Sequence, residues 1–369
     1  MRNLNVRRVL ATVLGIAMTT LGLVAAGPPA SAASRRCRFI QCRTTTTVPT
    51  TTSTPTTATT TTVPTPTTTR PTSGSVAQML AGLKLVNYYP TDAGWTLMWT
   101  KFPASEMNSD FAGMRAMGAN SVRIILQVST IGYPTPSATM LGELAQIVSM
   151  AHVDGLTVQL TLFDWFGGYT EIANSTAWAK AVLAPFKNDP RISFVELKNE
   201  VDVTSAAEMS WAATMLPIVK TDVGTIPVTL SLPGNAPAGA LATVKADFPS
   251  LDFYDVHDYG SVTSQLSADK ALVAPARLYV GEAGHSTRTG GSASTASAES
   301  SQASFFTSLN TLTKQLGIPL ASPWAWQDFQ DGTLTWVAAN SSEYGFGLLR
   351  IDGTQKLAFA VEKAAFQGS

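Results

Sequence analysis

The chain has 369 residues, 45% of them hydrophobic and 14% charged, so it is long enough to bury a large core in one or two domains. The formal net charge is zero, but eight of the 25 basic residues and none of the 25 acidic residues precede Ser75, which leaves 17 basic against 25 acidic residues and a net charge of −8 from there onward. An acidic body without a basic cluster argues against nucleic acid as a partner and favours a neutral or cationic substrate.

Residues 1–32 have the pattern of a secretory signal peptide. Basic residues within the first eight positions precede an apolar run at residues 9–26, and residues 30–32 read Ala-Ser-Ala, a small-residue cleavage signal. We therefore expect a secreted, extracellular protein. The apolar run is also close to membrane-spanning length, so an uncleaved anchor that tethers the protein at the cell surface is the alternative.

Residues 33–74 are expected to form a linker without a core of its own. Cys37 and Cys42, the two cysteines of the chain, are expected to form a small disulfide in an oxidising compartment. Residues 44–72 have Thr at 19 of 29 positions with Pro interspersed, a composition typical of an extended, semi-rigid spacer. Such a spacer fits an N-terminus fixed to a membrane or wall. Because the rest of the chain has no cysteine, Cys-based catalysis and Cys-ligated zinc are excluded there.

From residue 75 to residue 369 the sequence predicts alternating strands and helices. Apolar runs predict eight strands, at residues 83–89, 120–127, 156–163, 192–198, 227–232, 251–256, 277–280 and 318–326. Helices are predicted at residues 106–117, 138–153, 174–186, 205–223, 240–248, 297–316 and 355–366. Gly118 and Gly155 stand just past two of these helices and before an apolar run, which is the usual signal for a turn from helix to strand.

This alternation predicts a single α/β domain, a (β/α)8 TIM barrel. Eight strand–helix units fit into about 295 residues, the size typical of that fold. A doubly wound open sheet is the alternative. No G-x-G-x-x-G sequence follows the first predicted strand, where a nucleotide-binding open sheet would carry it.

Polar and aromatic side chains collect where the predicted strands end, and in a barrel the active site lies at the carboxyl ends of the strands. The fourth strand leads into Asn199 and Glu200, and Glu282 follows the seventh. Cleavage of an acetal needs two such carboxyl groups, one to protonate the leaving oxygen and one to attack or stabilise the sugar cation. Their environments must differ, so that one stays protonated near neutral pH. The other strand ends supply Arg123, Asp164, Trp165, His257, Tyr259, Trp324 and Trp326.

Each of these residues also has a purely structural interpretation. Glu200 could be a solubilising surface acid, Arg123 could pair with a carboxylate inside the barrel, and His257 could be a core histidine. The three tryptophans could be packing residues, although we favour sugar contact for at least two, because flat sugar faces stack on aromatic rings. Three scattered histidines predict no metal site, and no cofactor is expected.

The order of these residues resembles glycoside hydrolase family 5 and, more broadly, the retaining barrel glycosidases of clan A. The matching order is Arg on strand two, Asn-Glu on strand four, His-x-Tyr on strand six, Glu on strand seven and Trp on strand eight. The resemblance covers most of residues 82–366. Phe166 departs from the pattern, because many members have His there, and residues 164–169 with Trp178 look more like the β-mannanase branch.

The resemblance implies a role for each strand-end residue. Glu200 would be the general acid/base and Glu282 the nucleophile, with Arg123 favouring the ionised form of Glu282. Asn199 would bind the 2-hydroxyl of the reacting sugar. The remaining contacts to the nucleophile and the sugar would come from His257, Tyr259 and either Trp324 or Trp326.

These inferences predict an exported, monomeric, retaining glycoside hydrolase that cleaves a β-linked polysaccharide or oligosaccharide by double displacement. The substrate is expected to be a β-glucan such as cellulose, or a β-mannan. Two alternatives remain, which are a carbohydrate-binding barrel without catalysis and a cell-envelope transglycosylase. A short separation between the two carboxyl groups would favour catalysis with retention, because inversion needs room for a water molecule.

Overall fold

The computed structural model describes residues 73–260 and 262–368. The predicted signal peptide, the possible anchor and Cys37 and Cys42 lie outside the described residues, as does all but the end of the predicted linker. Within the described part of the chain, no helix is both long enough and apolar enough to cross a membrane.

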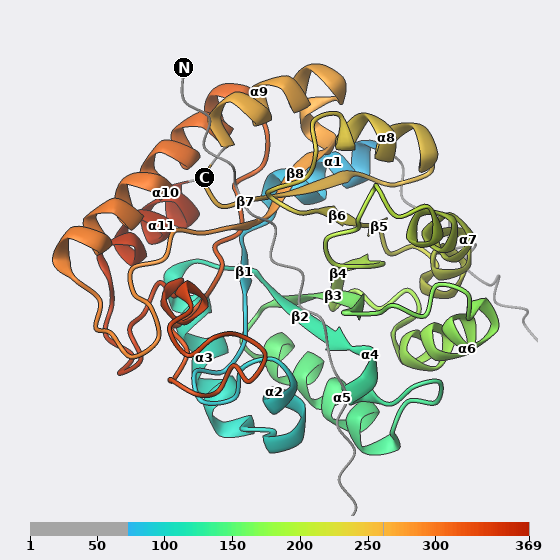
Figure 1. The fold of residues 1–369 in the computed structure, drawn as a ribbon, viewed down its shortest axis with the longest axis horizontal. Helices are drawn as coiled ribbons and strands as arrows, with labels where there is room; N and C mark the ends of the chain where they lie inside the picture. Colours follow the sequence, from blue (N-terminus) through green and yellow to red (C-terminus); the bar gives the residue numbers. More distant parts are fainter. Residues whose placement is uncertain (1–72, 261, 369) are drawn as a thin grey trace, which may run out of the picture. The chain divides into compact units, whose positions relative to one another are not determined.

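Parallel strands form the inner layer and helices the outer layer (Figure 1). The first sheet has the strand order β1(Leu85–Asn87), β2(Ser121–Gln127), β3(Thr157–Asp164), β4(Ile192–Glu196) and β5(Val228–Thr229). The second sheet has the strand order β6(Ser231–Leu232), β7(Tyr254–Asp258) and β8(Leu278–Ala283). All pairs of neighbouring strands run parallel, as expected where helices connect them.

Backbone hydrogen bonds close these two sheets into a barrel of eight strand positions. Leu230 separates β5 from β6, so the two short strands occupy the one position predicted at residues 227–232. The predicted eighth strand forms no regular ladder, but Ser322 N donates to Val280 O at 2.9 Å, and Asn87 N donates to Pro323 O at 3.1 Å. Residues 320–326 therefore link β8 to β1, and the predicted (β/α)8 barrel is confirmed.

The outer layer contains the seven predicted helices and several more. The long helices are α3(Ala104–Met117), α5(Ala138–Val153), α6(Ile172–Leu183), α7(Ala206–Val223), α8(Ala240–Asp247), α9(Val262–Leu272), α10(Ala296–Leu316) and α11(Leu357–Gly368). The short ones are α2(Thr96–Lys101), α4(Val128–Ile131), η1(Ala184–Phe186), η2(Pro275–Arg277) and η3(Ser342–Gly345). No helix was predicted at α9, which completes the unit between β7 and β8; its polar sequence lacks a strong apolar stripe.

One further helix, α1(Ser73–Gly82), was not predicted either, and it covers the amino end of the barrel. Its buried Val76 and Leu80, four residues apart, belong to a cluster with Leu85, Phe194 and Tyr279. An apolar plug at this end excludes water there. The polar strand ends are therefore left at the opposite mouth.

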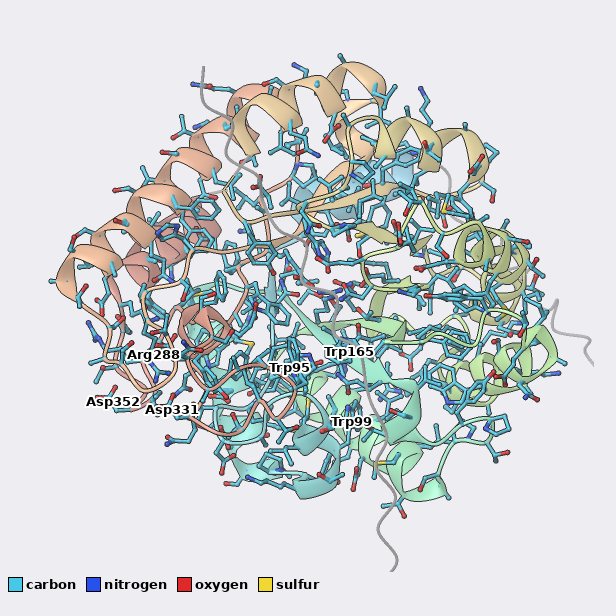
Figure 2. The ribbon with its side chains drawn as sticks, viewed as in Figure 1. Trp95, Trp99, Trp165, Arg288, Asp331 and Asp352 are labelled. Atoms are coloured by element: carbon cyan, nitrogen blue, oxygen red, sulfur yellow. The ribbon has the colours of Figure 1, made fainter. Side chains whose placement is uncertain are left out.

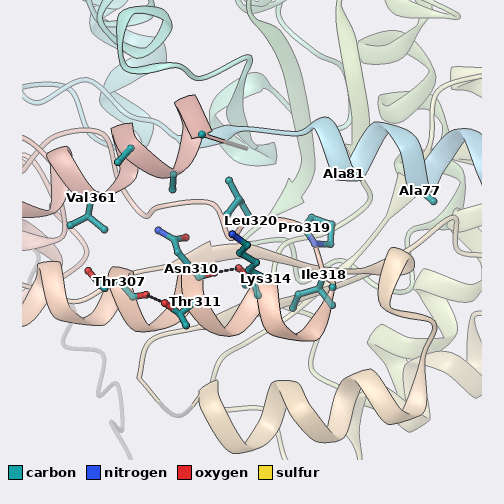
Figure 3. A pocket seen from close by; sticks show the side chains of 15 residues that line it. Ala77, Ala81, Thr307, Asn310, Thr311, Lys314, Ile318, Pro319, Leu320 and Val361 are labelled. Atoms are coloured by element: carbon teal, nitrogen blue, oxygen red, sulfur yellow. Dashed lines mark hydrogen bonds between the residues drawn. The ribbon is translucent and has the colours of Figure 1, made fainter.

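A cavity of about 600 Å³ lies between α1, α10 and α11 (Figure 3). Its lining is mostly small and apolar, and Lys314 is its only charged lining residue. Ile318 and Pro319, which also line it, begin the eighth barrel segment, so this cavity lies away from the strand ends that carry the carboxylates. The cavity is lined by no carboxylate, so it lacks the pair of acids that cleavage of an acetal needs.

Glu362 on α11 gives the fold a pH-dependent stability. Burial raises its pKa from 4.5 to about 8, and the hydrogen bond from Asn310 Nδ2 to Glu362 Oε1, 2.8 Å, offsets this only in part. Because the folded state holds this proton more tightly than the unfolded state, its contribution falls by about 1.4 kcal/mol per pH unit between these two pKa values. The stability of Glu362→Gln relative to wild type should therefore rise from pH 5 to pH 8, measured by urea unfolding.

The control for this prediction is Asp247→Asn, because Asp247 is exposed on α8. The stability of Asp247→Asn relative to wild type should stay constant across the same pH range. Parallel pH curves for Glu362→Gln and wild type would contradict the prediction.

Candidate active site

Glu282 and Arg123 form the centre of the barrel mouth. Glu282 lies within β8, which runs three residues beyond the predicted strand seven, and Arg123 lies in the middle of β2 with 1% of its surface exposed. Arg123 Nη1 donates a short hydrogen bond to Glu282 Oε1 and another, of 3.0 Å, to Asn87 Oδ1. The guanidinium thus places a positive charge directly beside the carboxylate that the sequence predicts to be the nucleophile.

The same guanidinium also pairs with a second carboxylate deeper in the barrel. Arg123 Nη2 lies 2.7 Å from Glu196 Oε2, and both side chains are fully buried. Thr161 Oγ1 and Gln159 Nε2 donate to the same oxygen at 2.6 and 3.0 Å. Arg123 therefore pairs with a carboxylate inside the barrel and also contacts Glu282 at the mouth, because one rigid fork serves both carboxylates.

Asn199 and Glu200 follow β4, which ends at Glu196, two residues earlier than predicted. Asn199 Oδ1 accepts from Arg123 Nη2 at 2.8 Å, while its Nδ2 donates to Asp164 Oδ1 at 3.2 Å. Glu200 has a φ of 50°, and its backbone N–H donates to Ser231 Oγ at 2.8 Å. A non-glycine residue at positive φ is held by its surroundings at a cost of about 1–3 kcal/mol, and such positions cluster at functional sites.

His257 joins the two glutamates. β7 ends at Asp258, two residues beyond the predicted strand six, and a register irregularity after Val256 sets His257 opposite Glu282. His257 Nδ1 lies 2.9 Å from Glu200 Oε1 and 3.4 Å from Glu282 Oε2. Carboxylate oxygens of Glu200 and Glu282 and a ring nitrogen of His257 all lie within 4.8 Å of one another.

Tyr259 completes the contacts of Glu282. Its hydroxyl donates a short hydrogen bond to Glu282 Oε2, the oxygen that Arg123 does not contact. Burial and the charge of Glu282 raise the pKa of Tyr259, so its proton stays on the phenol oxygen. One oxygen of Glu282 is therefore bound by Arg123, and the other accepts from Tyr259 and lies near His257.

The proton between His257 and Glu200 rests on the imidazole. Burial by itself lowers the pKa of His257, but the charge of Glu282, together with the hydrogen bond and charge of Glu200, raises it to about 9. Burial raises the pKa of Glu200, yet the hydrogen bond and charge of His257 outweigh burial and lower it. In the ligand-free site Glu200 is thus ionised, which differs from the expectation of one carboxyl group held protonated.

Glu343 is a third carboxyl group of the site, and no sequence pattern indicated it. It lies in η3, in the long segment after the eighth strand position, where no strand-end argument applies. Burial and the charges of Glu282 and Glu200 raise its pKa to about 7, against a hydrogen bond from Trp324. Asn87 and Ser231 were missed for a different reason, since a small polar residue inside a strand gives no sequence signal for the cluster it joins.

Asp164 lies in the interior of the barrel, and Trp165 lies at the rim of its mouth. Asp164 is buried, and burial raises its pKa to about 7 despite the charge of Arg123 and the hydrogen bond from Asn199. Asp164 Oδ1 accepts a hydrogen bond from Asn199 Nδ2, so Asp164 orients the Asn199 amide. Trp165, with a φ of 57°, is 60% exposed at the rim.

The two predicted tryptophans of strand eight point in different directions. Trp324 lies at the mouth, beside Glu343 and at 5.7 Å from the Trp95 ring. Trp326 does not line the site, contrary to the prediction. Its indole Nε1 donates to Asp110 Oδ1 of α3 at 3.0 Å, and its ring packs 6.0 Å from Phe359 of α11. Trp326 therefore belongs to the layer between barrel and helices, where its N–H has a partly buried hydrogen-bond partner.

Two groups of side chains have the spacing of metal ligands. They are Glu196, Asp255 and His257, and Glu200, His257 and Glu282. Both groups depend on His257, whose raised pKa keeps both ring nitrogens protonated at neutral pH, and Arg123 already contacts both Glu196 and Glu282. This donor chemistry favours a shared proton over a metal ion.

Comparison with known proteins shows the fold. No protein-family model matches the chain, and no curated protein matches its sequence. Among solved structures, an exo-β-1,4-mannosidase from an Opitutaceae bacterium (strain TAV5) is similar with a TM-score of 0.64 and 17% identity, over 77% of this chain and 59% of that one.

Two further structures are similar at comparable levels. A GH5_18 protein from Streptomyces cattleya, in complex with Manβ1-4GlcNAc, has a TM-score of 0.62 and 18% identity, over 77% of this chain and 80% of that one. A GH5_18 protein from Bifidobacterium longum, in complex with the same disaccharide, has a TM-score of 0.62 and 14% identity, over 78% of each chain. At these identities the comparisons establish a barrel fold shared with glycoside hydrolases.

Proposed function

We propose that the protein is a retaining glycoside hydrolase, similar to glycoside hydrolase family 5, that acts on β-linked sugars. The observation that carries this proposal is the spacing of Glu200 and Glu282, whose nearest oxygens lie within 4.8 Å. Retaining glycosidases have carboxyl groups about 5–5.5 Å apart, and inverting ones about 6.5–9.5 Å. The short spacing also favours catalysis over a binding-only barrel.

The two carboxyl groups divide the double displacement. Glu282, in contact with Arg123, attacks the anomeric carbon and forms an ester with the sugar, while Glu200 protonates the departing glycosidic oxygen. Glu200 then removes a proton from water, which attacks the same carbon, breaks the ester and releases the sugar with its original anomeric configuration. Tyr259 steadies the second oxygen of Glu282 throughout.

His257 supplies the proton that Glu200 needs for the first step. The resting pair holds one proton, on Nδ1 of His257, 2.9 Å from Glu200 Oε1. A bound sugar expels water from the mouth, which disfavours separated charges and favours the neutral pair of imidazole and carboxylic acid. Transfer of this proton over one hydrogen bond converts Glu200 to the carboxylic acid, which then protonates the leaving group.

The proposed substrate class is a β-mannoside. The similar solved proteins include an exo-β-1,4-mannosidase and proteins holding Manβ1-4GlcNAc. The loop after β3, residues 164–169, resembles the β-mannanase branch in sequence. We further propose that the protein acts outside the cell, either released or tethered through residues 1–72, on the basis of the signal-peptide and spacer patterns. We also propose that it acts as a monomer.

The test is hydrolysis of aryl β-mannosides, β-glucosides and β-1,4-linked oligosaccharides, with the anomer of the first product followed by proton NMR. We expect turnover of the β-mannosides with the β-anomer formed first. Initial formation of the α-anomer would contradict retention, and hydrolysis of none of these glycosides would contradict the proposed function.

A further inference from the structure

We infer that the enzyme acts in exo mode and removes single sugars from the non-reducing end of its substrate. The inference rests on the proposed function and deepens it. It follows from a group of three tryptophans, Trp95, Trp165 and Trp336, which we call the tryptophan wall. The wall closes the mouth on the side that an internal sugar chain would have to cross.

The tryptophan wall joins loops from three parts of the barrel. Trp95 lies between β1 and α2, Trp165 directly follows β3, and Trp336 lies between the eighth strand position and η3. The ring centroids of Trp95 and Trp336 are 4.7 Å apart, and those of Trp336 and Trp165 are 4.6 Å apart. Figure 2 labels Trp95 and Trp165, the two ends of the wall. Because β1 and β2 stand between these attachment points, the contact covers that sector of the mouth.

Buried polar contacts fix the loop that carries Trp336. Lys356 Nζ pairs with Asp328 Oδ1 at 2.6 Å, and both side chains are buried. Arg288 donates to Asp331 Oδ1 and, at 3.1 Å, to the carbonyl oxygen of Phe329; Arg288 and Asp331 are labelled in Figure 2. These contacts fix residues 328–331, which precede Trp336 in the same loop.

The position of the general acid shows which side of the site the wall occupies. Glu200 lines a cavity of about 530 Å³ with Pro233, Gly234, Tyr259 and Gly260, in the loops after β6 and β7. The acid protonates the leaving oxygen, so the leaving part of the substrate lies in this cavity. The wall lies on another side, where Trp95 contacts Trp324 with a centroid distance of 5.7 Å. A sugar over Glu282 and Trp324 therefore meets the wall at its non-reducing end.

The geometry of the three rings fits a barrier better than a platform. A row of sugars binds to aromatic rings that offer successive, nearly coplanar faces. Here the ring planes of Trp95 and Trp336 meet at 64° and those of Trp336 and Trp165 at 77°. Each ring therefore turns an edge toward its neighbour, and the wall offers no continuous flat surface. Trp165 and Trp336 are nevertheless 60% and 41% exposed, as expected of side chains that face a substrate.

The test uses β-1,4-linked manno- and gluco-oligosaccharides of two to six units, labelled at the reducing end. The wild type should shorten the labelled chain by one unit at a time and release a monosaccharide as its only unlabelled product. Labelled products two or more units shorter, formed at the start of the reaction, would overturn exo action while leaving the glycosidase proposal intact. Hydrolysis of no oligosaccharide and no aryl glycoside would overturn both.

Variants then test whether the tryptophan wall causes the restriction. Trp336→Ala should produce internal cuts in the longer oligosaccharides, at more than a tenfold higher share of products than in wild type. Trp336→Leu, which keeps apolar packing, covers the case in which the Ala variant does not fold. Leu357→Ala, at an exposed position of α11, is the control and should keep the wild-type pattern. A wild-type pattern in folded Trp336→Ala and Trp336→Leu would overturn the role of the wall.

Discussion

Glu282→Ala should lower kcat by roughly 10⁴-fold or more, about 5–6 kcal/mol of transition-state stabilisation. The variant lacks the carboxylate that attacks the anomeric carbon, so the ester with the sugar cannot form. Arg123 and Tyr259 then lose the anion that they hold in place. The measurement is kcat on an aryl β-mannoside, or on whichever aryl glycoside the wild type prefers.

Glu200→Ala should impair different steps, because Glu200 protonates the leaving group and deprotonates water and does not attack the anomeric carbon. With an aryl leaving group that departs without protonation, the first step should persist and the glycosyl-enzyme should accumulate. Added azide, a small anion that needs no general base, should then restore turnover and give a glycosyl azide of retained configuration. The same treatment should not give that product with Glu282→Ala.

The control for both variants is Glu143→Gln, at a partly buried position on α5 outside the barrel. It should keep wild-type activity. Activity of Glu282→Ala within tenfold of wild type would contradict its assignment as the nucleophile, whatever the substrate proves to be.

Arg123→Met should destabilise the fold by about 3–5 kcal/mol, the effect typical of removing one partner of a buried ion pair. The substitution leaves Glu196 buried beside Glu282 with no cation between them. It also removes the donors to Asn87 and Asn199, which connect β1 and the end of β4. The free energy of unfolding in guanidinium chloride at pH 7 is the measurement.

Two matched variants show whether the buried charge is the cause. Arg191→Met breaks a pair with Asp189 that is partly exposed, and it should cost no more than about 1 kcal/mol. Adding Glu196→Gln to Arg123→Met should recover part of the lost stability, because the double variant buries one carboxylate fewer without its guanidinium partner. Equal losses in Arg123→Met and Arg191→Met, or additive losses in the double variant, would contradict this account.

Local patterns were sufficient to predict the barrel. Alternating apolar strands and amphipathic helices, separated by glycines such as Gly118, follow from backbone geometry and burial within one segment. The strand ends that were predicted to carry Arg123, Glu200, His257 and Glu282 do meet at one mouth. Their meeting was predictable because all strands of a parallel barrel end on the same side.

The errors in the prediction arise where a residue's partner lies far away in the sequence. Trp326 has the same local pattern as Trp324, but Asp110, 216 positions away, binds its indole on the outer face. α1 was missed because its apolar residues are buried only by packing against the amino end of the complete barrel. Glu343 and Trp336 lie in a long segment without periodicity, so contacts with residues distant in the sequence, ion pairs among them, bring them to the site.

The sequence by itself thus determined the barrel, the two glutamates and most of the side chains around them, since these depend on strand periodicity and on the shared direction of parallel strands. The tertiary structure alone decided that the resting proton lies on His257, because that depends on burial and on two charges from different strands. It also decided that Glu343 joins the site and that Trp95, Trp165 and Trp336 close one side of the mouth. Contacts between loops that are up to about 240 residues apart carry no local signal, because their free energy arises only after the barrel has closed.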